Sequence, residues 1–133
     1  MKVHSQTDVG LVRTLNEDAC RTGLLGENGA WAVVCDGMGG ANGGEIASET
    51  AVKSIEEQIL ASYEEDFKSE EMKLMLSTLI FHANSAVYDM AQENESLKGM
   101  GTTIVVAIVL DNVAHIAHAG DSRAYLLHNG NIM

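Results

Sequence analysis

A single carboxylate stands between an apolar run and a cluster of glycines. The run from Trp31 to Cys35 has the length and composition of a buried strand, and Asp36 follows it directly. Five of the next eight residues are glycine, which allows a ligand to approach the backbone closely. A carboxylate beside accessible carbonyl groups suits a hard divalent cation with oxygen ligands. A strand-to-helix turn capped by Asp36 is the purely structural alternative.

Two familiar glycine-rich phosphate sites do not fit this loop. A P-loop requires Lys followed by Ser or Thr after its glycines, and no such pair follows here. A dinucleotide fingerprint that starts at Gly37 would need glycine at position 42, where the chain has Asn42. The carboxylate of Asp36 would also repel a phosphate at the place where such loops hold it. The pattern therefore favours a cation as the direct ligand.

A further acidic segment lies upstream, where Glu17 and Asp18 are adjacent and Arg13 precedes Asp18 by five residues. Adjacent side chains of an extended chain point to opposite faces, so only one of the two acids can face a given site. A surface turn with its charges in water is the alternative interpretation of this segment.

The turn signal Asn28-Gly29 relates this segment to the glycine-rich loop. Asn-Gly between two strand patterns is typical of a tight hairpin, so residues 18–25 and 30–35 are expected to pair as antiparallel strands. That pairing would bring Asp18 and Asp36 to the same end of the sheet. Two isolated carboxylates then become one candidate site.

Two amphipathic helices are expected after the glycines. The first starts near Glu45, whose charge suits a helix N-terminus. Its core-facing residues recur at four-residue spacing and are Ala47, Ala51, Ile55 and Ile59. The second follows Ser69, a suitable N-cap, and its methionines are interpreted as core filling. Its apolar face comprises Met72, Met75, Leu76, Leu79, Ala83, Ala86, Val87 and Met90.

The last third of the chain changes to strand patterns. His115 and His118 lie three residues apart on one of these strands and so face opposite sides, which excludes them as a ligand pair. A hairpin turn at residues 128–131 follows, and its return strand is expected to be missing. Strands are expected at residues 1–7, 102–110, 113–119 and 124–127.

Composition restricts the class of protein. Apolar residues make up 46% and charged residues 20%, which is typical of a globular chain. The net charge of −11 argues against nucleic acid or an anionic membrane as partners. Cys20 and Cys35 form no motif, so a reduced, cytoplasmic setting is expected. No apolar run approaches ~20 residues and no signal peptide is evident, so no membrane span or export is expected.

Four motifs occur in a fixed order between residues 8 and 130. They are Arg13-x-x-Asn16-Glu17-Asp18, then Asp36-Gly37-Met38-Gly39-Gly40 with Gly43-Gly44-Glu45 and Ala47-Ser48, then Gly101-Thr102-Thr103, and Gly120-Asp121-Ser122-Arg123. In this order they resemble the motifs of the PP2C/PPM family of metal-dependent protein serine/threonine phosphatases, and are most similar to the bacterial forms. The resemblance implies an α+β fold, an αββα sandwich of antiparallel sheets flanked by helices.

The resemblance also implies two Mn²⁺ or Mg²⁺ ions that activate a water for attack on phosphoserine or phosphothreonine in proteins. Asp36 would bridge both ions, and the Gly37 carbonyl would bind one of them. Glu17 and Asp18 would hold the water molecules around the ions. Phosphoproteins and a cognate Ser/Thr kinase are the partners that this function implies.

Two further roles and one departure follow from the same motifs. Arg13 would bind the phosphate oxygens through its fixed fork of donors. Asp121 would help to bind a third, weaker ion. Met38 stands where many eukaryotic members carry a histidine proposed as general acid, and a thioether cannot donate a proton.

Length is the second departure, because the family's catalytic domains are much longer and carry further metal-binding aspartates in their C-terminal half. Residues 1–133 are therefore interpreted as the N-terminal part of one catalytic domain, with the C-terminal half missing. We expect this chain alone to be inactive or very weak. It is also expected to self-associate, because the apolar edge at residues 125–128 would lack a partner strand.

Two other classes of function are alternatives to the phosphatase. A non-catalytic PP2C-like regulatory or binding module would not need all the charged motif residues, namely Arg13, Glu17, Asp18, Asp36 and Asp121. An unrelated metal-binding or structural α+β domain would not show the four motifs in order. The sequence therefore favours the phosphatase.

Overall fold

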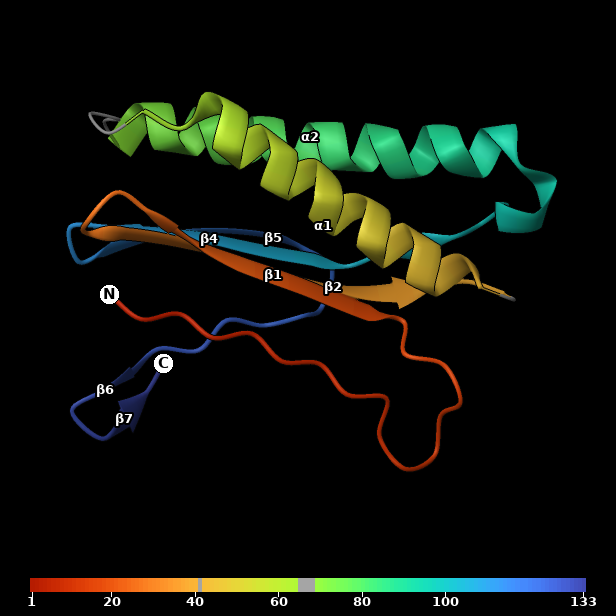
Figure 1. Ribbon diagram of the computed structural model, residues 1–133, viewed down its shortest axis with the longest axis horizontal. Coiled ribbons are helices and arrows are strands. Elements are labelled where there is room, and N and C mark those ends of the chain that lie inside the picture. Colours follow the sequence, from red (N-terminus) through yellow and green to blue (C-terminus); the bar gives the residue numbers. More distant parts are fainter. Residues whose placement is uncertain (41, 65–68) are drawn as a thin grey trace.

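Two long helices cover one face of an antiparallel β-sheet (Figure 1). The structure is a computed structural model that describes residues 1–40, 42–64 and 69–133. Its elements are β1 Asp18–Leu25, β2 Gly29–Met38, α1 Gly43–Ser62, α2 Ser69–Glu93, the 3₁₀ turn η1 Glu95–Leu97, β3 Gly101–Thr102, β4 Ile104–Leu110, β5 Val113–Ala119, β6 Leu127–His128 and β7 Asn131–Ile132. The segment before β1 and the β6–β7 ribbon lie on the other side of the sheet (Figure 1). This arrangement confirms the expected α+β class.

The sheet has the strand order β1-β2-β4-β5, with β3 paired to the end of β2. The predicted hairpin is confirmed, because β1 and β2 pair from Leu25 opposite Gly29 to Asp18 opposite Asp36. Its turn is built by Gly26, whose φ of 57° is a left-handed conformation that glycine adopts without cost. Gly29 belonged to the predicted turn signal, but in the structure it is the first residue of β2.

Side-chain alternation along β2 separates a core face from an open face. Trp31, Val33 and Cys35 are buried beneath the helices, whereas Val34 and Asp36 are exposed on the opposite face. The predicted stripe of α1 is buried in full, namely Ala47, Ala51, Ile55 and Ile59. Complete burial of a side chain such as isoleucine stabilises the fold by about 1.5–3 kcal/mol. The core therefore holds β2 rigidly from one side and leaves Asp36 accessible from the other.

The predicted face of α2 is largely confirmed. Met72 and Met75 are buried in the core, as expected for core filling. Met90 is exposed, because the buried stripe at this end of α2 runs through Val87 and Ala91 and leaves position 90 beside it. The helix begins at Ser69 itself, which the sequence had placed at the cap, and residues 65–68 before it lie outside the described residues.

Three strand predictions need correction. Residues 1–7 are exposed and form no strand, and no described strand pairs with them. The run 102–110 is interrupted at Thr103, whose backbone and side chain bond to Asp36 instead of continuing the ladder. Residues 124–126 are irregular, because regular pairing starts only at Leu127.

The return strand that was expected to be missing is present as the short β7. Leu127 pairs with Ile132, and Leu126 and Met133 exchange two N–H···O bonds of 2.9 Å. Asn129 and Gly130 both have positive φ, at 50° and 77°, as a type I′ hairpin turn requires. Among the described helices, none combines the length and apolar character needed to cross a lipid bilayer.

Candidate metal and phosphate site

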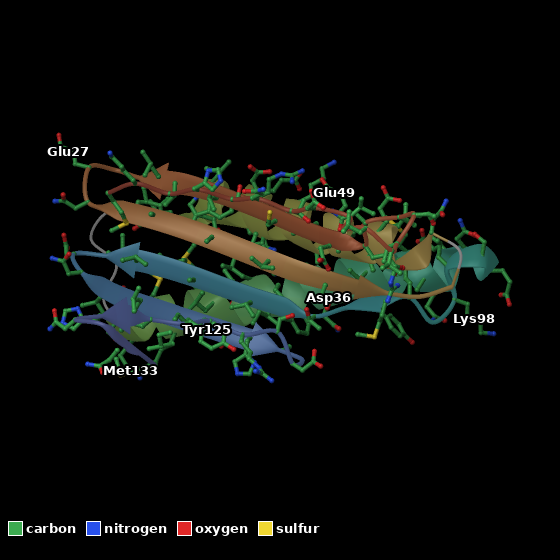
Figure 2. The ribbon with its side chains drawn as sticks, turned by 90° about the horizontal axis from the view of Figure 1, so that it is seen from below. Glu27, Asp36, Glu49, Lys98, Tyr125 and Met133 are labelled. Carbon is green, nitrogen blue, oxygen red and sulfur yellow. The ribbon has the colours of Figure 1, made fainter. Side chains whose placement is uncertain are left out.

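Asp18 and Asp36 form a directly opposed pair across β1 and β2. Figure 2 shows Asp36 near the end of β2 on the open face of the sheet. The pKa of Asp18 is raised, first because partial burial disfavours its charged form, and then because Asp36 contributes like charge and a hydrogen bond. The charge of Glu17 raises the pKa of Asp18 further. Acidic groups so arranged are stabilised when a cation offsets their charge.

Glycine permits the end of β2 and the start of α1 to meet at this point. The Gly37 N–H donates to the Glu17 carbonyl at 3.0 Å. A Cβ on Gly37 would overlap the Gly44 carbonyl and lie 2.6 Å from the Glu17 carbonyl oxygen. The glycine-rich loop is therefore required for close approach of three backbone segments, whereas the sequence had suggested only that a ligand could approach the backbone here.

Arg13 lies at the exposed rim of the same site. Its Nη1 is 3.7 Å from Glu17 Oε2, with 77% of the Arg13 side chain and 23% of the Glu17 side chain exposed. A pair this exposed contributes less than about 1 kcal/mol to stability. The guanidinium can therefore leave Glu17 for another anion at little cost.

Thr103 is a site residue whose role the sequence did not reveal. It is 4% exposed, and its Oγ1 accepts a hydrogen bond from the Asp36 N–H at 3.0 Å. The Thr103 N–H in turn donates to the Asp36 carbonyl at 2.9 Å, and Thr102 Oγ1 donates to the same carbonyl at 3.0 Å. Both backbone polar groups of Asp36 are thus fixed. The ordered motif Gly101-Thr102-Thr103 was the available signal in the sequence.

Asp121 belongs to the irregular segment after β5. It is exposed, and its neighbour Ser122 lies with Oγ 2.6 Å from Thr103 Oγ1. Within the described ranges, no three His, Cys, Asp or Glu side chains converge closely enough to enclose a metal ion. The structure therefore groups Arg13, Glu17, Asp18 and Asp36, and connects Asp121 to them through Thr103 rather than by direct clustering.

Other candidate groups near the site have simple structural roles. Burial raises the pKa of the Cys35 thiol to about 12, so this thiol is a poor nucleophile at neutral pH. Met38 is exposed at the end of β2. A groove of about 550 Å³ opens beside Asp18 and is lined in part by Glu45 and Glu49. Its acidic lining suits a cation better than an anion.

Comparison with known proteins decides the family. The sequence model of the family described as "Protein phosphatase 2C" matches residues 12–133. The chain belongs to the protein phosphatase 2C family. This confirms the resemblance carried by the four ordered motifs.

Relatives and solved structures of similar proteins agree with this assignment. The serine/threonine phosphatase stp of Listeria monocytogenes serovar 1/2a is 36% identical over 132 residues, which cover 97% of this chain and 51% of the relative. The crystal structure of serine/threonine phosphatase Stp1 from Staphylococcus aureus matches with a TM-score of 0.86 at 37% identity, covering 96% of this chain and 50% of that one. The chain spans about half the length of these relatives.

A third similar structure contains a metal. The catalytic domain of serine/threonine protein phosphatase PstP, in complex with 2 manganese ions, matches with a TM-score of 0.76 at 32% identity, covering 96% of this protein phosphatase 2C chain and 51% of that one. The donors in the present chain fit such an ion, because Asp18 and Asp36 supply facing carboxylates at one strand end. Carboxylate oxygens are ligands of Mg²⁺ and Mn²⁺.

Proposed function

We propose that this chain takes part in metal-dependent hydrolysis of phosphoserine and phosphothreonine in proteins. The observation that carries the proposal is the opposed Asp18–Asp36 pair at the glycine junction, with Arg13 at its rim. Mn²⁺ or Mg²⁺ ions, when bound, supply an activated water and neutralise charge on the phosphoryl group. Two ions near Asp36 and a third near Asp121 are the stoichiometry that we infer.

Each acidic residue then has a distinct task. Asp36, with the Gly37 carbonyl, holds the metal ions directly. Asp18 and Glu17 accept hydrogen bonds from the water around the ions, which orients that water. The raised pKa of Asp18 supports a cation nearby, because a cation favours the charged form that partial burial and the charge of Asp36 disfavour.

Arg13 is the residue that we assign to substrate binding. Its guanidinium is exposed, and the ion pair that it makes among the described residues is the weak, 3.7 Å contact with Glu17. A substrate phosphate offers two oxygens to its donor fork, which is a stronger interaction than the pair it replaces. The leaving serine or threonine oxygen takes its proton from water or another group, because the thioether of Met38 cannot donate one.

The full reaction needs more than the described residues. These residues supply no compact group of three metal-binding side chains, and the relatives are about twice as long. We therefore propose that the 133-residue chain alone is very weakly active. Phosphoproteins produced by a Ser/Thr kinase are the substrates, and the free thiols of Cys20 and Cys35 support a reduced, cytoplasmic setting.

Self-association is a further part of the proposal. Leu24, Val34 and Ile116 are large apolar side chains exposed on the open face of the sheet. A second copy packed on this face would remove these apolar side chains from water. The net charge of −11 opposes extended aggregation and favours a small assembly.

Phosphate release from a phosphothreonine peptide tests the proposed function. The chain should be measured with Mn²⁺, both alone and extended by the C-terminal half that its relatives possess. The extended protein should be active, Asp36→Asn should abolish the activity, and Arg13→Ala should mainly raise KM. Turnover that survives Asp36→Asn would refute the assignment of Asp36.

A further inference from the structure

Thr103 connects two loops that are distant in the sequence. On one side it accepts from the Asp36 N–H at 3.0 Å and donates its own N–H to the Asp36 carbonyl at 2.9 Å. On the other side its Oγ1 lies 2.6 Å from Ser122 Oγ. Because Thr103 Oγ1 accepts from Asp36, its own hydrogen is available to Ser122. We call Thr103, Ser122, Gly120 and the Asp36 backbone the Thr103 latch.

Gly120 adds a packing contact to these hydrogen bonds. Its φ is +100°, and a Cβ built on it would lie 2.8 Å from Thr103 Cγ2. The turn after β5 therefore rests directly on the Thr103 side chain, in a backbone conformation that favours glycine. Both the methyl and the hydroxyl of Thr103 thus face the segment that carries Asp121.

We propose that the Thr103 latch is a positioning device that fixes the Asp121 segment against the end of β2 that carries Asp36. The inference rests on the proposed function, in which Asp36 and Asp121 serve neighbouring ions. Ser122 and Thr103 are positioning residues in this scheme, because neither touches substrate or metal. Loss of the latch leaves both carboxylates in the chain but no longer fixes their separation.

The latch makes a prediction about hydroxyl groups rather than about side-chain size. Thr103→Val keeps the shape and removes the hydroxyl, whereas Thr103→Ser keeps the hydroxyl and removes the methyl. Ser122→Ala removes the second hydroxyl. Ser85→Ala is the matched control, since Ser85 is also half-buried and its Oγ donates only within α2, to the Phe81 carbonyl at 3.1 Å.

The first measurement uses nuclear magnetic resonance on the metal-free chain. Thr103→Val should speed hydrogen exchange of the Asp36 amide by roughly tenfold, because its acceptor is gone. Ser122→Ala and Thr103→Val should both lower the order parameters of amides 120–123. Thr103→Ser and Ser85→Ala should leave the Asp36 exchange rate within about twofold of the unaltered chain.

The second measurement is Mn²⁺ affinity by calorimetry. Ser122→Ala and Thr103→Val should each raise the Kd for Mn²⁺ by about tenfold, as loss of an orienting partner does at other metal sites. When Asp121 is already replaced by Asn, Ser122→Ala should change the Kd for Mn²⁺ by less than about twofold, because both substitutions act through the Asp121 carboxylate.

The two measurements separate the latch from the proposed function. Unchanged order of amides 120–123 in Ser122→Ala and Thr103→Val would overturn the latch. If residues 120–123 become more mobile while the Kd for Mn²⁺ is unchanged, the Thr103 latch is only a structural contact and its positioning role is overturned. Failure of the unaltered chain to bind Mn²⁺, with loosening as expected, would count against the proposed function instead.

Discussion

Asp18 and Asp36 face one another at the open end of the β1–β2 hairpin, and this places two carboxylates side by side at one end of the strands. The hairpin register, set by the turn at the far end of the strands, determines this pairing. A slip of one residue would send one of the two side chains to the helix-covered face. The pair is therefore a direct product of the fold.

The raised pKa of Asp18 predicts that this residue lowers the stability of the metal-free chain as the pH rises. A carboxyl whose folded pKa lies above its ordinary value of 3.8 favours the fold below that value, and this benefit is lost as pH rises through the folded pKa. Asp18→Asn should therefore raise Tm at pH 7 in chelator by about 1–3 °C and change little at pH 3. Thermal melts at the two pH values measure this.

Glu27→Gln is the control for that experiment. Glu27 lies in the turn at the other end of the hairpin, so its removal changes net charge without affecting the carboxylate pair. Equal stabilisation by both variants would show that net charge alone is responsible. Stabilisation by Asp18→Asn that persists at pH 3 would contradict the assigned cause.

Gly37 should tolerate no side chain. A Cβ there would meet the carbonyl groups of Gly44 and Glu17, which are backbone atoms that cannot rotate away. Gly37→Ala should lower the free energy of unfolding by about 3 kcal/mol, measured by urea denaturation. Gly40→Ala is the control, because a Cβ at Gly40 meets nothing within 4 Å. An equally small effect at both positions would contradict the close junction.

The two thiols should differ in reactivity. Burial raises the pKa of Cys35 to about 12, whereas Cys20 is only half-buried. A chromogenic disulfide reagent at pH 8 should therefore modify one thiol rapidly, and Cys20→Ser should remove that reaction. Cys35 should react only after denaturant is added. Rapid reaction of Cys35 in the folded chain would show that the core opens readily.

The open sheet face predicts concentration-dependent assembly. Val34→Lys should shift the chain toward monomer in light scattering, because a buried ammonium opposes the proposed contact. Leu74→Lys, at an exposed position on α2, should have no such effect. A strictly monomeric chain whose melting does not depend on concentration would refute self-association.

The sequence predicted the elements that local pattern determines. The apolar run that begins at Trp31 and the hairpin signal before it led directly to the Asp18–Asp36 pairing. The four-residue spacing of Ile55 and Ile59 likewise predicted the buried face of α1. Each of these features depends on residues close together in the chain.

Contacts between distant segments were not accessible in this way. In the sequence, Thr103 is one more β-branched residue of a predicted strand. Only the structure shows that it forms hydrogen bonds with Asp36 and Ser122. Residues 124 and 125 have a strand pattern but lie outside the described ladders, and Leu126 pairs only with Met133. Pattern gives the tendency of a segment, whereas its partners come from tertiary structure.

Mn²⁺ titration of the metal-free chain tests the central claim, that the Asp18–Asp36 pair is a metal site, most directly. Calorimetry should show a weak binding event, because the described residues supply no group of three metal-binding side chains. Asp36→Ala should abolish this event and Glu27→Gln should leave it unchanged. Mn²⁺ binding that is tight and equally strong in Asp36→Ala would contradict the account.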